Sequence, residues 1–425
     1  MPGRAMVTIA LALIAGISTV FLCVKPAATL PSGFNNNVVA NVSTPTALAF
    51  ISSDGRMLIT TKTGQLQVYK EGTPGTTQAL DISDKVCSGM TERGLLGVAV
   101  DPDFEINHYV YLYYTFKKHG VCPKKEPNNP NNPVNRVSRF IMIDGTANPA
   151  SEVVLIDNIP SPNGNHNGGD LKFGKDDYLY VSVGDGGCDY AEPTKCQYEN
   201  DASRDRHVLL GKVLRITRDG EIPSGNPYMG TNSDRCNATG RTAAGRACQE
   251  IIAYGLRNPF RIAFDPDASG TRFWINDVGG ARWEEIDRGS VGGDYGWNLC
   301  EGRHDNPDRP GSVSCSGGGR IPPLHEYSHN TGCTSITGGA FVPDDGSWPD
   351  SYDNAYLFAD YICDKIFVLK PKSGGGFART LFTTDPGGRG PVAMTFGPRG
   401  SNGTALYYTT FADGGKVRRI SYSGS

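Results

Sequence analysis

The chain has 425 residues, of which 20% are charged and 38% are hydrophobic, and its formal net charge is −3. The hydrophobic content argues against global disorder, and the absence of basic runs interleaved with aromatic residues argues against nucleic acid as a partner. With 54 Gly and 28 Pro, the composition is typical of short strands joined by many tight turns.

The N-terminal segment has the pattern of an export signal. Arg4 precedes an apolar stretch from Met6 to Val24, and residues 26–28 (Pro-Ala-Ala) offer small residues for cleavage. We therefore predict a signal peptide over residues 1–28, a single domain over residues 29–425, and a secreted (extracellular or periplasmic) protein without a membrane span in its mature form. A retained membrane anchor is the alternative, because the apolar stretch is close to the length that spans a bilayer.

The cysteines are consistent with export. Removal of Cys23 with the signal leaves an even number, which in an exported chain implies disulfides. Sequential pairing would give five local bridges, and other connectivities stay open. A zinc site is disfavoured because the chain contains no C-x-x-C. The ten cysteines are Cys87, Cys122, Cys188, Cys196, Cys236, Cys248, Cys300, Cys315, Cys333 and Cys363.

One hairpin pattern occurs six times along the chain. A short alternating strand ends in a turn rich in Pro, Asp and Gly, and a second strand rich in Tyr, Phe, Val or Leu follows. Period-two alternation of apolar residues across a turn is the signature of a β-hairpin. The strand pairs are residues 47–50 with 57–60, 95–100 with 109–113, 170–173 with 178–181, 261–264 with 273–275, 339–341 with 356–358, and 393–396 with 405–408.

The repeat predicts an all-β fold, a six-bladed β-propeller with four-stranded antiparallel blades. Six such units cannot each bury their apolar faces alone, so radial packing is the natural solution. Residues 209–216 and 415–420 have the pattern of outer strands of two blades. A β-sandwich is the alternative, but a sandwich has no reason to repeat one hairpin six times.

Polar residues recur just before the first strand of each hairpin. If all blades share one orientation, these residues meet at one end of the central channel. Convergent polar groups in a concave site are the default hypothesis for an active site. In chain order, the residues are Thr46, Glu92, Arg93, Asn165, His166, Asn167, Arg257, Asn258, Ser335, Thr337 and Arg389.

His166 is the candidate for proton transfer, because imidazole titrates near neutral pH and accepts a proton; a loop histidine satisfied by backbone groups is the alternative. Arg257 is placed to stabilise developing negative charge or to form an ion pair between blades. Asn258, before Pro259, could instead initiate a turn. Asp185, in Gly184-Asp-Gly-Gly187, is predicted to be a turn residue, and a metal ligand is the alternative.

Acidic residues interleaved with glycines follow the fourth hairpin. Hard oxygen ligands together with glycine carbonyls suit Ca²⁺, and a solvated acidic loop is the alternative. The residues are Asp277, Gly279, Gly280, Glu284, Glu285 and Asp287.

Residues 325–329 match the zinc motif H-E-x-x-H, which works only on a helix. Pro322-Pro323 precedes this window and Asn330-Thr-Gly332 follows it, so we expect neither a helix nor a zinc protease. His329 could still reach the mouth of the channel.

Several motifs, in order from about residue 40 to about residue 420, resemble those of the soluble quinoprotein glucose/sorbosone dehydrogenases. They are Glu92-Arg-Gly-Leu-Leu-Gly97 with Asp101-Pro-Asp-Phe104; Asn165-His-Asn-Gly-Gly169 with Gly184-Asp-Gly-Gly187; Gly211-Lys-Val-Leu-Arg215 with Asp219-Gly220 and Asn226-Pro227; Tyr254-Gly-Leu-Arg-Asn-Pro259; and Tyr295-Gly-Trp297. The resemblance implies a six-bladed propeller that binds pyrroloquinoline quinone (PQQ) and Ca²⁺ at one end of its channel. It also implies oxidation of an aldose at its anomeric carbon to the lactone, with an external electron acceptor.

The resemblance also implies roles for individual residues. His166 would be the general base, and Arg257 and Asn258 would contact the quinone and stabilise charge on it. Backbone carbonyls of Gly279 and Gly280 would hold the catalytic Ca²⁺, and Glu284 matches a structural calcium ligand. The residues expected to bind the cofactor are Glu92, Asn165, His166, Arg257, Asn258, His329, Lys365 and Arg389.

The chain departs from the glucose dehydrogenases of that family at several of these positions. Those enzymes carry a glutamine in place of Glu92 and an aspartate in place of Asn165. Lys365 and Arg389 lie near the positions of their carboxylate-clamping lysine and arginines, but out of register. Similar propellers also occur in Hedgehog-interacting proteins, so a non-catalytic propeller that binds sugar or protein is the alternative function.

Overall fold

The chain folds into a ring of β-sheets, as the computed structural model shows for residues 30–424 apart from 125, 312–313, 316–317 and 385. The predicted signal peptide, residues 1–28 with Cys23, lies outside the described residues. The single α-helix of the described chain is α1 (Phe104–Asn107). Within the same ranges, no helix is long and apolar enough to cross a bilayer.

Six antiparallel sheets of four main strands form the blades, numbered here in chain order and given from inner to outer strand. Blade 1 contains β2 (Pro45–Phe50), β3 (Met57–Thr61), β4 (Gln65–Tyr69) and β5 (Thr77–Asp81). Blade 2 contains β6 (Leu95–Val100), β7 (Tyr109–Phe116), β8 (Val134–Ile143) and β10 (Val153–Pro160). Blade 3 contains β11 (Leu171–Phe173), β12 (Leu179–Val183), β13 (Lys212–Ile216) and β16 (Ile251–Tyr254).

Blade 4 contains β17 (Pro259–Phe264), β18 (Phe273–Asp277), β19 (Trp283–Arg288) and β23 (His325–Ser328). Blade 5 contains β24 (Ile336–Phe341), β25 (Tyr356–Asp360), β26 (Lys365–Pro371) and β27 (Phe377–Thr384). Blade 6 contains β28 (Pro391–Pro398), β29 (Thr404–Thr410), β30 (Lys416–Tyr422) and, from the other end of the chain, β1 (Phe34–Asn41). Short accessory strands are β9 (Thr146–Ala147), β14 (Ser233–Asp234), β15 (Ala247–Cys248), β20 (Gly293–Asp294), β21 (Cys300–Glu301) and β22 (His304–Asp305).

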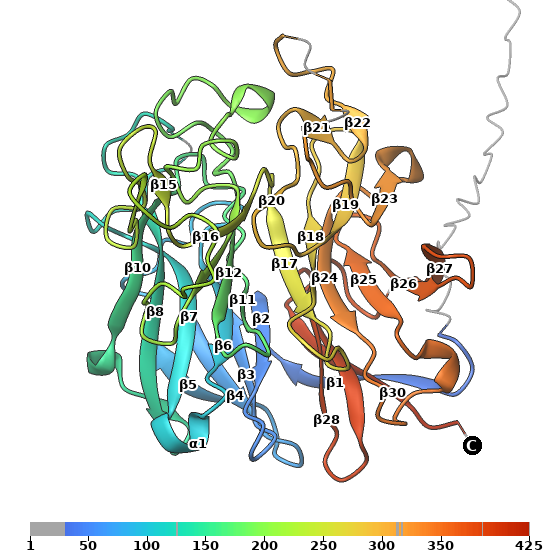
Figure 1. Ribbon diagram of the computed structural model, residues 1–425. Helices are drawn as coiled ribbons and strands as arrows, with labels where there is room; N and C mark the ends of the chain where they lie inside the picture. The colour runs from blue at the N-terminus through green and yellow to red at the C-terminus, as the bar shows by residue number, and fades with distance from the viewer. Residues whose placement is uncertain (1–29, 125, 312–313, 316–317, 385, 425) are drawn as a thin grey trace, which may run out of the picture.

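The inner strands form a closed circle. Each contacts the inner strands of the two neighbouring blades, in the order β2, β6, β11, β17, β24, β28 and back to β2. Blades 1 to 3 therefore occupy one half of the ring and blades 4 to 6 the other (Figure 1). The predicted six-bladed propeller is confirmed, and all six predicted hairpins are the inner two strands of the six blades. The predicted outer strands are confirmed as β13 and β30, the third strands of blades 3 and 6.

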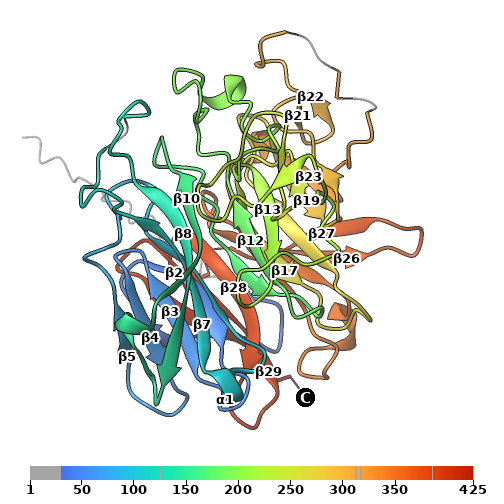
Figure 2. The ribbon, with the colours of Figure 1, turned by 60° about the vertical axis from the view of Figure 1, so that its left-hand side comes forward.

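The ring is closed by a strand that the sequence did not reveal. β1 pairs antiparallel with β30, from Phe34 opposite Tyr422 to Asn41 opposite Lys416. The first described strand therefore completes the last blade, so unfolding of either end of this pair opens the circle. In Figure 2, strands β28 and β29 of blade 6 lie next to blade 1, whose inner strand β2 contacts both.

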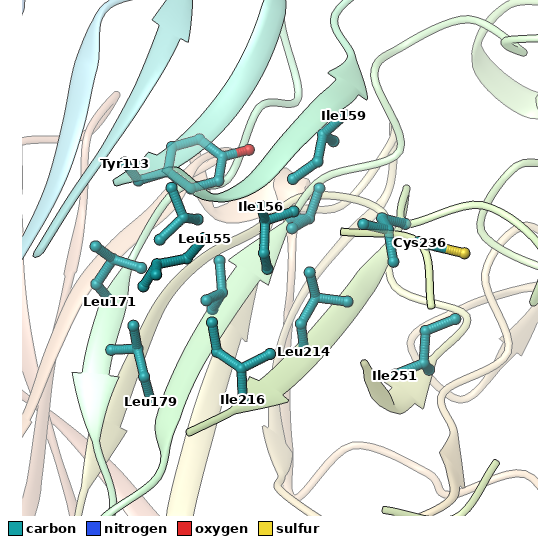
Figure 3. Close-up of a cluster of buried hydrophobic side chains, with 14 of the residues drawn as sticks. Tyr113, Leu155, Ile156, Ile159, Leu171, Leu179, Leu214, Ile216, Cys236 and Ile251 are labelled. Carbon is teal, nitrogen blue, oxygen red and sulfur yellow. The ribbon is translucent and has the colours of Figure 1, made fainter. Parts of the chain in front are cut away.

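Apolar side chains fill the interfaces between neighbouring blades. Between blades 2 and 3, Tyr113, Ile156, Leu179 and Ile216 are buried in one cluster (Figure 3). Burial of such side chains is worth roughly 1.5–3 kcal/mol each, so the blades are held mainly by these interfaces.

Five disulfides fasten the loops between strands. They join Cys87 to Cys122, Cys188 to Cys196, Cys236 to Cys248, Cys300 to Cys315 and Cys333 to Cys363, so neighbouring cysteines in the sequence are paired.

The closing strand gives the first prediction. The Phe34 ring is buried against Trp348, Tyr352, Phe382 and Tyr422. Phe34→Ala is expected to lower the free energy of unfolding by about 3–5 kcal/mol, measured by urea denaturation.

The control is Val38→Ala on the same strand, whose side chain is 44% exposed, and we expect it to change stability by less than about 0.5 kcal/mol. Equal effects of the two substitutions would show that β1 does not close the ring energetically.

Candidate functional site

A cavity of about 210 Å³ opens where the six inner strands begin. Because β6 runs toward α1, its first residues lie at the opposite end of the ring, the end that carries β21 and β22 (Figures 1 and 2). All six blades or the loops before them contribute to its wall. The lining includes Thr46, Lys62, Glu92, His166, Arg257, Asn258, Arg261, Ser335, Thr337, Tyr361, Val392 and Phe411.

His166 is held by a buried carboxylate. Its Nδ1 lies 2.7 Å from Asp185 Oδ1, and Asp185 also accepts hydrogen bonds from the Gly187 amide (2.8 Å) and from Trp297 Nε1 (2.9 Å). Since the neighbours of Asp185 are donors, we assign the proton to His166 Nδ1, which leaves Nε2 as an acceptor. The arrangement is that of a general base with an orienting carboxylate.

Asp185 was predicted as a turn residue, with a metal ligand as the alternative, and its pairing with His166 is a finding of the structure. It lies just after β12, whereas His166 lies just before β11 of the same blade. Antiparallel pairing of β11 with β12 brings these two strand ends together. An acidic residue directly after the second strand of the hairpin was the signal that could have revealed it.

Arg257 and Asn258 are fixed by Asp277. The two Asp277 carboxylate oxygens accept the backbone N–H of Arg257 (2.9 Å) and of Asn258 (2.6 Å). Arg257 Nη1 donates to the carbonyl of Val278 at 3.0 Å, and its guanidinium carbon lies 5.4 Å from the Trp297 ring centroid. Arg257 Nε is buried and has no hydrogen-bond partner among the described residues.

Asn258 connects three blades at the cavity. Its Oδ1 accepts the Gly168 amide (3.2 Å), and its Nδ2 donates to Glu92 Oε2 (3.1 Å). Glu92 Oε2 also accepts the Asn167 amide at 3.3 Å. Glu92 is therefore a fixed carboxylate in the wall.

Lys62 and Arg261 reach the same cavity and were not predicted as site residues. Lys62 Nζ donates to the Met90 carbonyl at 2.5 Å. Arg261, on the inner strand β17, crosses the channel and donates from Nη2 to the Thr46 carbonyl of blade 1 at 2.5 Å. Blades 1 and 4 are opposite in the ring, so this hydrogen bond joins opposite sides of the channel.

Three carboxylates form a buried cluster beside the cavity. Asp277, Glu285 and Asp287 each place an oxygen within 4.8 Å of the others, and both Asp287 oxygens lack a hydrogen-bond partner among the described residues. Burial, reinforced by the neighbouring carboxylates, raises the pKa of Glu285 and Asp287 well above the ordinary value. Such a cluster suits a hard cation such as Ca²⁺.

Asp277 also titrates unusually. Burial raises its pKa to about 7. Because the folded-state pKa exceeds that of the unfolded chain, the contribution of this group to stability is present at low pH and is lost as the pH rises through about 7, unless a cation neutralises the cluster.

Comparison with known proteins identifies the family. The family model described as Glucose / Sorbosone dehydrogenase matches residues 42–370, which is more than half of the chain. The chain belongs to this family.

The chain is similar both to a relative named as a glucose dehydrogenase and to relatives whose names do not denote an enzyme. The chain is 27% identical to the HIPL2 protein of Arabidopsis thaliana over 428 residues, covering 88% of the chain and 58% of the relative. It is 28% identical to quinoprotein glucose dehydrogenase B of Acinetobacter calcoaceticus, covering 63% of the chain and 53% of that protein. The chain thus spans little more than half the length of these relatives. The human Hedgehog-interacting protein is 29% identical over 54% of the chain and 31% of its own length.

Solved structures share the fold. The aldose sugar dehydrogenase of Escherichia coli in its apo form has a TM-score of 0.71 at 24% identity, with 92% of this chain and 99% of that chain covered. The PQQ-bound aldose sugar dehydrogenase of Streptomyces coelicolor has a TM-score of 0.65 at 22% identity, with 92% and 99% covered.

Not all residues implied by the family resemblance lie at the cavity. His166, Arg257, Asn258 and Glu92 line it, whereas the other four expected cofactor-binding residues do not. Arg389 has a side chain 63% exposed and lies 3.6 Å from Asp364. Those four residues are Asn165, His329, Lys365 and Arg389. Blade 6 contributes Val392 and Phe411 instead.

The predicted calcium residues separate into two places. Glu284 is not part of the carboxylate cluster, because its Oε1 lies 2.7 Å from His329 Nε2 and its Oε2 accepts the Ile336 amide at 2.9 Å. Gly280 lies in a loop whose four consecutive amides, residues 280–283, donate to Glu301 Oε1 at 2.7–3.0 Å. Glu301 therefore fixes the curvature of the loop that carries Gly279 and Gly280.

Residues 325–328 of the H-E-x-x-H match form strand β23, and His329 begins a 3₁₀ turn. The geometry that the zinc motif requires is therefore absent from this described segment, as expected from its flanking residues.

The carboxylate cluster gives the second prediction. In EDTA, Asp287→Asn is expected to raise the midpoint of thermal unfolding, because it removes a buried ionisable group without partners. Ca²⁺ at about 100 times its dissociation constant should stabilise the unsubstituted protein by about 2.7 kcal/mol and the variant much less.

The matched control is Glu105→Gln, an exposed carboxylate on α1, which should leave the calcium response unchanged. An equal calcium response in Asp287→Asn and the unsubstituted protein would remove the cluster as a metal centre.

Proposed function

We propose that this protein is a PQQ- and Ca²⁺-dependent sugar dehydrogenase that oxidises an aldose at its anomeric carbon to the lactone. The observation that carries the proposal is the His166–Asp185 pair at a cavity lined from all six blades. Membership of the glucose/sorbosone dehydrogenase family and the similarity to quinoprotein glucose dehydrogenase B support it.

The residues at the cavity fit an anionic, planar cofactor such as PQQ. Three cationic side chains line the cavity, those of Lys62, Arg257 and Arg261. The Nε atoms of Arg257 and Arg261 are buried without a partner among the described residues, so donors are available for a carboxylate or a quinone oxygen. Arg257 and Asn258 would hold the cofactor, which when bound supplies a quinone that accepts hydride.

The chemistry of the chain itself centres on His166. Its Nε2 takes the proton from the anomeric hydroxyl of the sugar, and the Asp185 carboxylate stabilises the imidazolium that results. Arg257 offers a fixed donor to negative charge that develops in the cavity. The hydride that leaves the anomeric carbon and the proton taken by His166 together account for oxidation to the lactone.

Calcium enters the proposal at two places. The cluster of Asp277, Glu285 and Asp287 would hold a structural ion, since both Asp287 oxygens are buried and have no hydrogen-bond partner among the described residues. A catalytic ion at the carbonyls of Gly279 and Gly280 remains a prediction from the family resemblance. There it would act as a Lewis acid.

We also propose export of the mature domain, residues 29–425, after removal of residues 1–28. Five disulfides in one chain are typical of extracellular or periplasmic proteins. An external electron acceptor is then expected in that compartment.

A non-catalytic propeller that binds sugar or protein is the second candidate. It is favoured by the positions of Lys365 and Arg389, which do not line the cavity, and by the similarity to the Hedgehog-interacting protein.

Reconstitution separates the two candidates. Purified protein with Ca²⁺ and PQQ should reduce an artificial dye only when an aldose is present, and His166→Ala should lower turnover by roughly 10²–10⁴-fold while PQQ binding persists. The control is His119→Ala, an exposed histidine away from the cavity. Absence of sugar-dependent reduction with PQQ and Ca²⁺ added would favour the binding propeller.

A separate prediction concerns the carboxylate behind the base. Asp185→Asn is expected to lower turnover by roughly 10²-fold or more with PQQ affinity unchanged, because the amide no longer fixes the Nδ1–H tautomer. Trp297→Phe removes the donor to Asp185 Oδ2 but keeps an aromatic ring near Arg257, and it should cost less. If Asp185→Asn retained full turnover, the orienting role of this carboxylate would be refuted.

A further inference from the structure

The charges at the cavity do not balance. Lys62, Arg257 and Arg261 line it together with one carboxylate, Glu92. Among the described residues, none of the three cations has a carboxylate oxygen within 4.0 Å. The cavity wall therefore carries more positive than negative charge.

Glu92 cannot compensate for this excess. Its Oε2 is held by neutral donors, Asn258 Nδ2 and the Asn167 amide. Burial lowers the pKa of both Lys62 and Arg261, and it outweighs the nearby negative charges, which are Glu92 for Lys62 and Asp170 and Glu92 for Arg261. Both cations are therefore desolvated without a direct counter-ion.

Arg261 is the more deeply buried of the two. Its side chain is 4% exposed, and it donates to two backbone carbonyls, those of Thr46 and Phe260. Its Nε is buried without a partner in the described chain. A guanidinium offers five N–H donors, so this side chain keeps donors that no acceptor among the described residues uses.

Lys62 lies on the same side of the cavity as the Arg261 contact. It follows β3 in blade 1, the blade whose Thr46 carbonyl accepts from Arg261. Among the described residues its Nζ donates to one acceptor, the Met90 carbonyl, although an ammonium has three N–H donors. The two cations thus converge on blade 1.

A buried cation without a counter-ion is unfavourable, and a carboxylate that accepts from a guanidinium and an ammonium removes that cost. A neutral sugar ring offers hydroxyl acceptors but no charge. The cavity therefore suits a ligand with an acidic group.

We propose that Lys62 and Arg261 form a carboxylate-binding subsite on the blade 1 side of the cavity, whereas Lys365 belongs to blade 5 and Arg389 lies just before the inner strand of blade 6. The subsite rests on the proposed function for its location, but its own test is binding. The carboxylate has two possible sources, the cofactor PQQ or an acidic sugar of the uronic acid class.

Isothermal titration calorimetry with PQQ, D-glucuronate and D-glucose tests this subsite. The variants are Lys62→Met, which loses the charge of a partly exposed side chain, and Arg261→Lys, which keeps the charge but loses the fork of donors. Each lost charge-assisted hydrogen bond is expected to weaken carboxylate binding by roughly 10-fold to 100-fold. Lys70→Met, an exposed lysine outside the cavity, is the matched control, and circular dichroism checks folding.

The outcomes separate the sources. Weaker PQQ binding in Lys62→Met and Arg261→Lys, with Lys70→Met unchanged, assigns the subsite to the cofactor. Binding of glucuronate but not PQQ or glucose, weakened by the same variants, assigns it to an acidic sugar and would stand even if reconstituted turnover failed. Unaltered affinities in folded Lys62→Met and Arg261→Lys, weakening only in Lys365→Met, or no binding of either acid by the unsubstituted protein would overturn the proposal.

Discussion

The carboxylate of Asp277 joins the two halves of the site. One side of it accepts the amides of Arg257 and Asn258, which fixes both side chains at the cavity. The other side belongs to the buried cluster with Glu285 and Asp287. A cation in the cluster would keep Asp277 ionised, and an ionised carboxylate is the stronger acceptor for those two amides. Metal occupancy and the geometry of the cavity are therefore linked through a single side chain.

The propeller makes this site possible because every blade starts at the same end of the channel. Thr46, Glu92, His166, Asn258 and Thr337 come from five separate stretches of sequence, yet the ring places them around one cavity. The arrangement holds only while the circle is closed. Closure depends on the pairing of β1 with β30, two strands that lie near opposite ends of the sequence. Stability of the last blade and order at the cavity are thus expected to be coupled, even though Phe34 lies outside the cavity lining.

Local patterns predicted most of the fold. The six hairpins have apolar alternation and turn residues within a few positions of each other, and that information is contained in short windows. Strand β1 carries three consecutive asparagines, Asn35 to Asn37, and only Phe34 and Ala40 of its residues are buried. It therefore lacks the alternation of apolar and polar residues that marks the strands of the six hairpins. β1 forms because it pairs with β30, which lies at the other end of the described chain, and a short window of sequence around β1 does not show that pairing.

For the site, the position of a residue along the chain predicted which end of the channel it occupies, but it did not predict whether the side chain points into the cavity. His166, Arg257 and Asn258 precede inner strands and do line the cavity, as expected for residues at that end of the channel. Arg389 also precedes an inner strand, but its side chain points to solvent near Asp364. The prediction considered residues that directly precede the first strand of each hairpin. Lys62 follows the second strand of blade 1 and Arg261 lies within an inner strand, so neither residue was included. Asp185 was missed because its role depends on a partner beyond the hairpin turn.

These positions also define how a ligand would lie in the cavity. His166 belongs to blade 3, whereas Lys62 belongs to blade 1 and the Arg261 guanidinium is anchored there. A ligand that places a carboxylate between Lys62 and Arg261 leaves its other end toward His166 and Arg257. If that carboxylate belongs to the cofactor, the sugar must enter from the His166 side; if it belongs to the sugar, the acidic group and the reacting hydroxyl lie at opposite ends of the same molecule. In either case, the excess positive charge of the wall orients the ligand before the base acts, which is the main requirement for proton transfer from one chosen hydroxyl.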